Sequence, residues 1–536
     1  MTSDDTAGNG AHTLEAARDR DARSPRVIME GLRMARAGLP RPVAAVDVGS
    51  NSVRIAIVAL DRDAQLEVLE EASATPRLIQ DVQREGRLSD ASIDEVVAIL
   101  RDFRAIARGA DADPLIAVAT SAVRDAANGG ALAERLQSDL GIRLDILDGE
   151  TEARLAFLGA VHNLPVESGL VVDIGGGSME LLRFDQRLPG PSWTLPLGAV
   201  RLTAQFLHDD PPSQVELRHL REHITATLSQ AGVGSLPAGG LLVGTGGTAR
   251  NIAKVDRARR RYPIGRLHGY ELSRDGVRSV ADLVRIRTTA VRRDLPGLNE
   301  DRADIIVAGA LVLQVLTEMT DAEGIVISGH GLREGIALNA HHRPLPPVDR
   351  LRESALDRAV GRFASSYRTD AVSRTTIAVA LAGAAGLAGD EVPGAEILGT
   401  LRAASMLLDL GRGVDYYNRH RHTEALAIAY GLPGWSHREL ALICAIVRQA
   451  DSEKYDPVDA YRPLLAAADR PRIAAAAAIL AAADELQRRT AHAGAPIVRQ
   501  LESGAVQIDA EIDSVRLNAL SGRLERTTGL QLLTEH

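Results

Sequence analysis

Two short loops carry the residue types that bind phosphate groups. The first runs from Asp47 to Ser52 and the second from Asp173 to Ser178, and each follows an apolar stretch typical of a buried strand. Glycine and serine expose backbone N–H groups and hydroxyls, which donate hydrogen bonds to phosphate oxygens. The aspartate that opens each loop stands where a hydrated divalent cation could bridge to the same oxygens. Either loop alone could be a simple hairpin turn, but the matched pair predicts a phosphoanhydride site.

Two further segments carry charged residues that suit this chemistry. Arg124 follows an apolar strand and a Thr-Ser pair, and its guanidinium could grip a phosphate bidentately, or pair on the surface with Asp125 or Glu134. Glu150 and Glu152 open an amphipathic helix, where acidic side chains ordinarily complement the helix dipole. A carboxylate beside the cleft could instead activate water for attack on phosphorus.

A third glycine-rich segment, Gly244 to Thr248, lies between a predicted strand at Gly240 to Val243 and a helix expected to begin near Ala249. Its spacing matches neither the P-loop nor the dinucleotide fingerprint, and Gly246 and Thr248 are its candidate phosphate contacts. A local basic cluster follows, which could track a polyanion or form a solvated helix end: Lys254, Arg257, Arg259, Arg260, Arg261 and Arg266.

The apolar pattern predicts the elements that must position these loops. A strand through Val46, a tight turn and an alternating segment from Val53 to Ile57 predict a β-hairpin with a polar tip. A similar unit spans Gly169 to Phe184, and the strings DVGSNSVRIAIV and DIGGGSMELLRF share Asp, Gly and Ser at the same spacing. This internal repeat predicts two related α/β lobes whose loops face each other across a cleft.

Seven motifs in order resemble those of the exopolyphosphatase and guanosine pentaphosphate phosphatase family: DVGSNS, ATSAVRDAAN, GETEARL, DIGGGSMEL, GTGGT, RADIIVAGA and ISGHGLREG. The resemblance covers Val43 to Asn339. It implies the α/β fold of the actin-like superfamily, in which two ribonuclease-H-like lobes surround a cleft.

The same resemblance implies roles for individual residues. It makes Glu152, rather than Glu150, the catalytic base, and it places Asp173 and Glu180 beside magnesium or the attacking water, with Asp47 as a further metal candidate. Arg124 is implied to bind phosphate. The implied phosphate cradle comprises Ser50, Asn51, Gly176, Gly177 and Ser178, to which the composition of the loops adds Ser52 and Gly175.

The activity implied is removal of the terminal phosphate from inorganic polyphosphate, with Mg²⁺ as cofactor. The alternatives are hydrolysis of the 5′ γ-phosphate of guanosine pentaphosphate, and a non-catalytic sensor of guanosine alarmones or polyphosphate. A sugar or acetate kinase relative would need an acceptor pocket and usually an Asp base, whereas GETEARL and LREG point away from that reading.

The chain is long enough for several domains. The Pro-rich stretch HHRPLPPVD is the main predicted boundary, with long helical patterns after it and alternating apolar residues from Val506 to Ile512 near the end. The predicted units are a disordered tail at 1–40, ribonuclease-H-like lobes at 41–155 and 156–341, an all-α domain at 349–490 and a small α+β unit at 491–536.

The predicted helical domain resembles metal phosphohydrolases of the His-Asp type in a degenerate form. Asp409 is present, but Leu408 stands where a metal-binding His would precede it, and losing a ligand should disable such a site. We therefore expect His420, His422 and His437 to be structural or to face phosphate.

Composition narrows the setting of the protein. The net charge of −9 argues against a general nucleic-acid or anionic-membrane binder. The single cysteine, Cys444, excludes a disulfide framework within the chain, and no apolar run reaches membrane-spanning length. These features predict a cytoplasmic protein. We also expect a homodimer, because a channel for a long substrate is easily built across two subunits.

Overall fold

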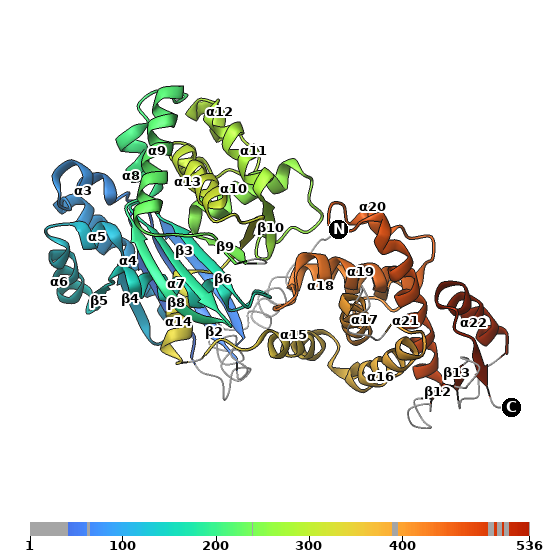
Figure 1. The fold of residues 1–536 in the computed structure, drawn as a ribbon. Helices are drawn as coiled ribbons and strands as arrows, with labels where there is room; N and C mark the ends of the chain where they lie inside the picture. Colours follow the sequence, from blue (N-terminus) through green and yellow to red (C-terminus); the bar gives the residue numbers. More distant parts are fainter. Residues whose placement is uncertain are drawn as a thin grey trace, which may run out of the picture.

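The computed structural model describes residues 41–61, 65–237, 240–342, 344–387, 395–490, 498–500, 506–508 and 514–534. Figure 1 shows two α/β layers that lie together on one side of the molecule and a helical part on the other. The predicted tail at 1–40 lies outside the described residues, as do Ala510 and Ile512 of the alternating C-terminal pattern.

The first sheet has the strand order β3-β2-β1-β4-β5. Its central strand β1 pairs antiparallel with β2 and parallel with β4. The elements of this lobe are β1 Val43–Val48, β2 Val53–Leu60, β3 Leu66–Ala74, α3 Ile79–Glu85, α4 Asp90–Gly109, β4 Leu115–Ala119, α5 Ser121–Asp125, α6 Gly129–Leu140 and β5 Leu144–Ile146.

The second sheet has the order β10-β11-β9-β6-β7-β8 and repeats this arrangement, since β6 pairs antiparallel with β7 and parallel with β9. Its strands are β6 Gly169–Ile174, β7 Met179–Asp185, β8 Leu188–Leu195, β9 Leu241–Thr245, β10 Tyr270–Ser273 and β11 Gly324–Ile327. The helices around it are α7 Gly149–Val161, α8 Ala199–Phe206, α9 Gln214–Gln230, α10 Gly246–Arg259, α11 Arg274–Arg285, α12 Thr289–Arg293, α13 Ile306–Met319 and α14 Leu332–Ala340.

The two phosphate-loop candidates close in the same way. The N–H of Gly49 donates to the carbonyl of Ser52 (3.1 Å), and the N–H of Gly175 donates to the carbonyl of Ser178 (3.0 Å). Each loop therefore joins the central strand of its sheet to an antiparallel neighbour. The predicted hairpins and the predicted repeat of two α/β units are confirmed.

Helices α7 and α14 lie between the two sheets. Helix α14 packs on β1 and β2 of the first sheet, whereas α7 packs on β6 to β9 of the second. The two helices touch through glycine: a Cβ at Gly159 would lie 1.9 Å from the Gly331 carbonyl oxygen, and one at Gly335 would lie 1.8 Å from the Leu155 carbonyl oxygen. The predicted domain limit between residues 155 and 156 falls inside α7.

A largely helical region with its own apolar core follows. Its elements are α15 Val348–Phe363, α16 Arg368–Ala384, α17 Ala395–Leu407, α18 Arg419–Tyr430, α19 His437–Asp451, α20 Pro457–Ala460 and α21 Arg470–Thr490. The last described elements are α22 Ser514–Thr528 and a sheet of β12 Val498–Gln500, β13 Val506–Ile508 and β14 Leu532–Thr534. None of the described helices combines the length and apolarity needed to cross a membrane.

Replacing Gly335 with alanine should weaken the contact between α7 and α14. The added methyl group has no room beside the Leu155 backbone, and overpacking of this kind costs about 1 to 3 kcal/mol of unfolding free energy. Urea titration measures the change. The matched control is Gly361→Ala at an exposed position of α15, where nothing lies within 4 Å of the added Cβ, and stability should hold or rise slightly. Equal effects of the two substitutions would contradict the close packing.

Candidate active site

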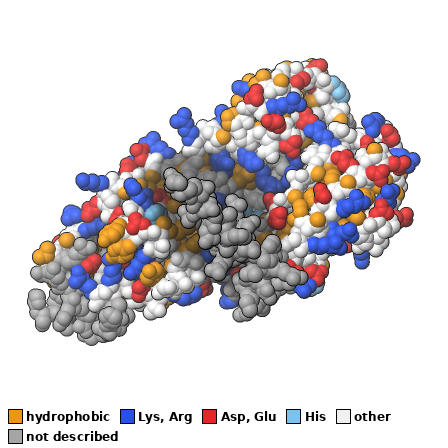
Figure 2. Space-filling model, turned by 180° about the vertical axis from the view of Figure 1, so that it is seen from behind, with side chains coloured by type: hydrophobic (Ala, Val, Ile, Leu, Met, Phe, Trp, Pro, Cys, Tyr) orange, Lys and Arg blue, Asp and Glu red, His pale blue; other side chains and the backbone are white. Residues whose placement is uncertain are grey.

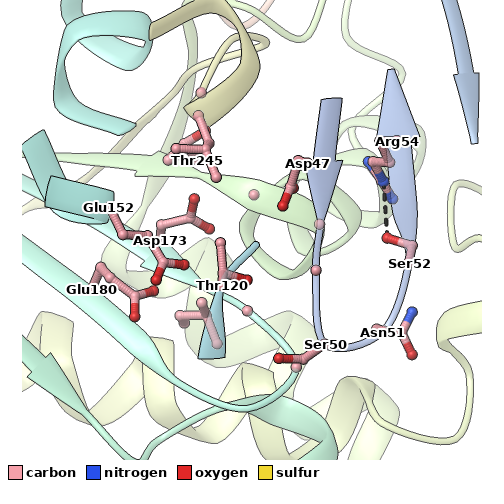
Figure 3. A pocket seen from close by; sticks show the side chains of 18 of the residues that line it. Asp47, Ser50, Asn51, Ser52, Arg54, Thr120, Glu152, Asp173, Glu180 and Thr245 are labelled. Carbon is pink, nitrogen blue, oxygen red and sulfur yellow. Dashed lines mark hydrogen bonds between the residues drawn. The ribbon is translucent and has the colours of Figure 1, made fainter. Parts of the chain in front are cut away.

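A pocket of about 100 Å³ lies where the two hairpin loops meet. Figure 3 shows side chains from both loops and from α7 converging on it. Of the residues predicted from the sequence, the pocket is lined by Asp47, Ser50, Asn51, Ser52, Glu152, Asp173, Gly175, Gly176, Ser178, Glu180 and Gly246. Two loops about 125 positions apart in the sequence thus form one site.

The two loops pack directly on each other at the pocket. A Cβ at Gly176 would lie 3.1 Å from the Cβ of Ser50, and one at Gly177 would lie 2.5 Å from the Oγ of Ser121. Ser50 and Ser121 share a hydrogen bond of 2.6 Å between their hydroxyls. Gly177, predicted to hold phosphate, is not among the lining residues, and its missing side chain lets the second loop approach the first.

Five carboxyl side chains line the pocket; Glu334 lies beside Arg333, and the other four are Asp47, Glu152, Asp173 and Glu180. Figure 3 shows Glu152, Asp173 and Glu180 grouped together, with Asp47 on the opposite wall. Burial raises the pKa of Glu152 to about 7 and that of Asp47 to about 6. Burial also raises the pKa of Asp173 and Glu180, and the Glu152 carboxylate adds to the rise at Glu180. A group of buried acids held this close favours binding of a cation.

Helix α7 presents Glu152 to this group. Asp148 caps the helix by accepting a hydrogen bond from the N–H of Thr151 (2.8 Å). The first helical turn then separates the two glutamates. Glu150 points to solvent and pairs with Arg154, while Glu152 is 9% exposed and lines the pocket. Of the two glutamates that the local sequence could not tell apart, only Glu152 therefore lies in the pocket.

Arg124 lies behind the pocket rather than in its lining. One of its Nη atoms donates to the Glu152 carboxylate (2.8 Å) and to the Leu147 carbonyl (3.0 Å). The surface pairs considered from sequence, with Asp125 or Glu134, do not form; Asp125 pairs with Arg201 instead. Arg124 thus holds the Glu152 side chain in place and favours its charged form, and its predicted phosphate contact stays a prediction.

Four arginines that the sequence analysis did not single out also line the pocket: Arg54, Arg250, Arg302 and Arg333. Within the described part of the chain, the first three form no ion pair; Arg54 donates to Ser52 Oγ (3.0 Å) and Arg250 to backbone carbonyls. Burial, together with the nearby Arg54 cation, lowers the pKa of Arg302 to about 10. Such unpaired, mutually repelling cations favour an anionic ligand.

A sequence signal for these arginines existed in the motifs themselves. Arg54 follows the first loop directly, Arg250 lies within GTGGTARN, Arg302 begins RADIIVAGA in a short 3₁₀ helix at Glu300–Arg302, and Arg333 lies within GLREG. Each motif was recognised as a whole, but its arginine was not assigned to the site.

The GTGGT segment differs from the loop expected there. Helix α10 begins at Gly246, three residues earlier than predicted, so Gly246 and Gly247 stand at the start of the helix while Gly244 lies in β9. Gly246 lies against Asp173, because a Cβ there would be 2.0 Å from Asp173 Oδ1. Thr248 is 2% exposed, and its hydroxyl donates to the Ile174 carbonyl (3.1 Å), which ties α10 to the second loop. Its predicted phosphate contact stays untested.

The carboxyl groups suit a magnesium ion that keeps part of its hydration shell. Asp47 Oδ1 is buried with no hydrogen-bond partner. Among the described residues, no group of three or more His, Cys, Asp or Glu side chains could hold a metal by itself. Mg²⁺ commonly binds through one or two carboxylates together with water and substrate phosphates, which fits this arrangement.

In the helical region, Asp409 is paired with arginine side chains. Its carboxylate forms ion pairs with Arg374 and Arg419, both at 2.8 Å, and all three side chains are nearly inaccessible to solvent. Leu408 lies in the apolar core. His437 contacts the second lobe, through Tyr262 and the backbone of His268. The prediction of a degenerate His-Asp domain stays a prediction.

Comparison with known proteins places this site in a family. The model of the Ppx/GppA phosphatase family matches residues 57–343. The chain belongs to the Ppx/GppA phosphatase family. Exopolyphosphatase 1 of Mycobacterium leprae (strain TN) is 34% identical over 297 residues, which are 55% of this chain and 87% of that protein. Exopolyphosphatase 2 of Mycobacterium tuberculosis (strain ATCC 25618 / H37Rv) is 29% identical over 315 residues, 55% of this chain and 98% of that protein.

Solved structures agree with this family membership. The Ppx/GppA family member of Aquifex aeolicus is 28% identical, with a TM-score of 0.51, and the match covers 56% of this chain and 98% of that one. An exopolyphosphatase from Cytophaga hutchinsonii, 23% identical with a TM-score of 0.52 over 56% and 97% of the two chains, supports the fold alone. The two mixed sheets therefore form the Ppx/GppA core, and the family match ends before the helical region.

Replacing Arg124 with glutamine should shift the pH dependence of any reaction that needs ionised Glu152. The Arg124 cation lowers the pKa of Glu152 against the effect of burial, so its removal raises that pKa. The acidic limb of the kcat/KM profile should therefore move to higher pH. Arg154→Gln on the same helix is the control, because Arg154 pairs only with exposed Glu150 and should leave the limb in place. An unchanged profile for Arg124→Gln would contradict the proposed coupling.

Proposed function

We propose that the protein is an exopolyphosphatase, which hydrolyses the terminal phosphoanhydride bond of inorganic polyphosphate and releases orthophosphate. The observation that carries this proposal is the pocket between the loops, where buried acids with Glu152 among them face arginines without carboxylate partners. Membership of the Ppx/GppA family and the names of its relatives support the same chemistry.

The proposed reaction uses Glu152 as the general base. Glu152 accepts a proton from water while the water oxygen bonds to the terminal phosphorus, and the bridging P–O bond breaks with its electron pair left on the shortened chain. A carboxyl group with a pKa near 7 is suited to take up this proton at neutral pH. Arg124 holds the Glu152 side chain in place during the step.

The remaining pocket residues hold the substrate and its charge. Backbone N–H groups of the two loops and the hydroxyls of Ser50 and Ser178 surround the terminal phosphates. Arg54, Arg250 and Arg302 neutralise phosphate oxygens as charge develops. Magnesium, when bound, would be held by one or two of the carboxylates Asp47, Asp173 and Glu180 together with water and substrate phosphates, and it would supply electrostatic stabilisation of the phosphate oxygens.

A larger outer pocket favours a long substrate. It has a volume of about 440 Å³ and shares Arg54, Gly247, Arg250 and Glu334 with the phosphate pocket, so the two are adjacent. Lys254 and Arg266 also line this outer pocket. The two acidic side chains of this pocket, Glu71 and Glu334, both lie beside Arg333. The cationic side chains that line the pocket therefore lack carboxylate partners among its described residues. A chain that continues beyond the terminal phosphates would meet these cations.

Guanosine pentaphosphate is a second candidate substrate, and one feature of the outer pocket favours it. The imidazole rings of His268 and His330 stack with their centroids 4.7 Å apart. His268 Nε2 and His330 Nδ1 are buried and have no hydrogen-bond partner, and burial lowers the pKa of both rings. A neutral ring pair with free nitrogen atoms can contact a nucleobase.

Phosphate release should be faster from long-chain polyphosphate than from guanosine pentaphosphate. The adjacent cationic pocket offers more contacts to a chain of phosphates than to a nucleotide with one polyphosphate arm. A comparison of kcat/KM for the two substrates measures this, in the presence of Mg²⁺ and again after chelation, which should abolish release. A clear preference for the nucleotide would overturn the polyphosphate assignment. Binding of either compound with negligible turnover would support a sensor.

The Glu152→Gln variant should lose roughly 10²- to 10⁴-fold in kcat, the usual contribution of a general base. Glutamine keeps the size of the side chain but cannot take up the proton. The control is Glu150→Gln. Glu150 lies two residues earlier in the same helical turn, its side chain is 70% exposed, and the variant should keep full activity. If Glu152→Gln retains near-normal turnover, Glu152 is not the base.

A further inference from the structure

The helical region holds one wall of the outer pocket. Arg266 lines that pocket, but its guanidinium is fastened to the last turn of α18, where an Nη atom donates to the carbonyl oxygens of Tyr430 (2.6 Å) and Ala429 (3.4 Å). These carbonyls belong to a helix C-terminus, which attracts a cation. Among the described residues, no carboxylate forms an ion pair with Arg266, so the contact orients the cation without neutralising it.

Gly431 makes this contact possible. A Cβ at Gly431 would lie 2.5 Å from the Cζ of Arg266, so the guanidinium packs directly on the backbone that ends α18. Gly431 also has φ of +70°, which residues with a side chain adopt only with strain. The position of the Arg266 cation therefore depends on a glycine in the helical region.

A second contact holds the same pocket wall two residues further on. His437, the first residue of α19, donates from Nε2 to the His268 carbonyl (3.0 Å), and its Nδ1 accepts a hydrogen bond from the Tyr262 hydroxyl (3.1 Å). His268 itself lines the outer pocket. The segment from Arg266 to His268 is thus held at both ends by the helical region.

We propose that the helical region determines how the enzyme binds the part of the substrate beyond the terminal phosphates, and that Arg266 is the specificity residue through which it acts. The reacting phosphate lies in the pocket between the loops, which the helical region does not line. A phosphate chain that extends outward meets Lys254 and Arg266 in the outer pocket. The choice of a phosphate chain as ligand rests on the proposed function.

Substitution of Gly431 tests this without altering a lining residue. Gly431→Ala should displace the Arg266 guanidinium and weaken binding of long-chain polyphosphate about tenfold, the value of one lost charge-assisted hydrogen bond. Binding of tripolyphosphate, whose three phosphates we expect to lie between the loops, should change little. The matched control is Gly386→Ala after α16, which has the same φ of +70° and nothing within 4 Å of its Cβ. Arg266→Gln should reproduce the loss for the long chain.

Equilibrium binding by titration calorimetry and turnover are measured separately on the full chain. The inference is overturned if Gly431→Ala weakens binding of the long and the short ligand equally. It is also overturned if neither Gly431→Ala nor Arg266→Gln weakens binding of the long ligand. If Gly431→Ala lowers the unfolding temperature more than Gly386→Ala does, its binding data reflect lost stability, and the binding measured for Arg266→Gln tests the inference instead. Absence of turnover in the unaltered protein would defeat the proposed hydrolysis, whereas the binding ratios would still test the role of Arg266.

Discussion

The charges buried between the two loops are the constraint on which the rest of the core depends. Asp47, Glu152, Asp173 and Glu180 are held close to Arg54, Arg250 and Arg302, but within the described residues these arginines form no ion pairs with them. Unpaired buried charge is unfavourable, so a rigid scaffold must hold these groups in place. Bound phosphate groups would compensate the arginines, and a divalent cation would compensate the carboxylates.

Backbone contacts, rather than long side chains, hold the charged groups of the pocket in place. Each loop is closed by a main-chain hydrogen bond at the end of a central strand, and glycines allow one loop to pack on the other. Thr248 fastens α10 to the second loop, and the Asp148 cap fixes the start of α7 so that Glu152 points inward. The polar groups therefore have little freedom to move apart and satisfy their charges in solvent.

Much of this could be predicted from local sequence, and the remainder could not for a physical reason. The hairpins at Asp47 and Asp173 follow from apolar strands that flank turn-forming residues, and the repeat of that pattern predicted two related lobes. Arg250 and Arg302 were not predicted, because a single arginine in a helical turn has no local signature that distinguishes a ligand-facing side chain from a solvated one. Glu150 and Glu152 were separated only by family resemblance, since burial depends on how α7 packs on the second sheet. Glycine is needed at Gly246, where α10 begins, because its φ is +76° and a Cβ there would clash with Asp173.

The crossing of α7 and α14 also limits how the lobes can move. Each helix packs on a different sheet, and the glycine contacts bring their backbones together with no side chain between them. A hinge that opened the cleft would have to separate these backbones and leave their close-packed surfaces exposed. A sliding movement along the helix pair keeps the surfaces in contact and needs only small rotamer changes. Entry of substrate and departure of orthophosphate are therefore expected to accompany shear of one lobe over the other, with Glu152 carried on the sliding surface.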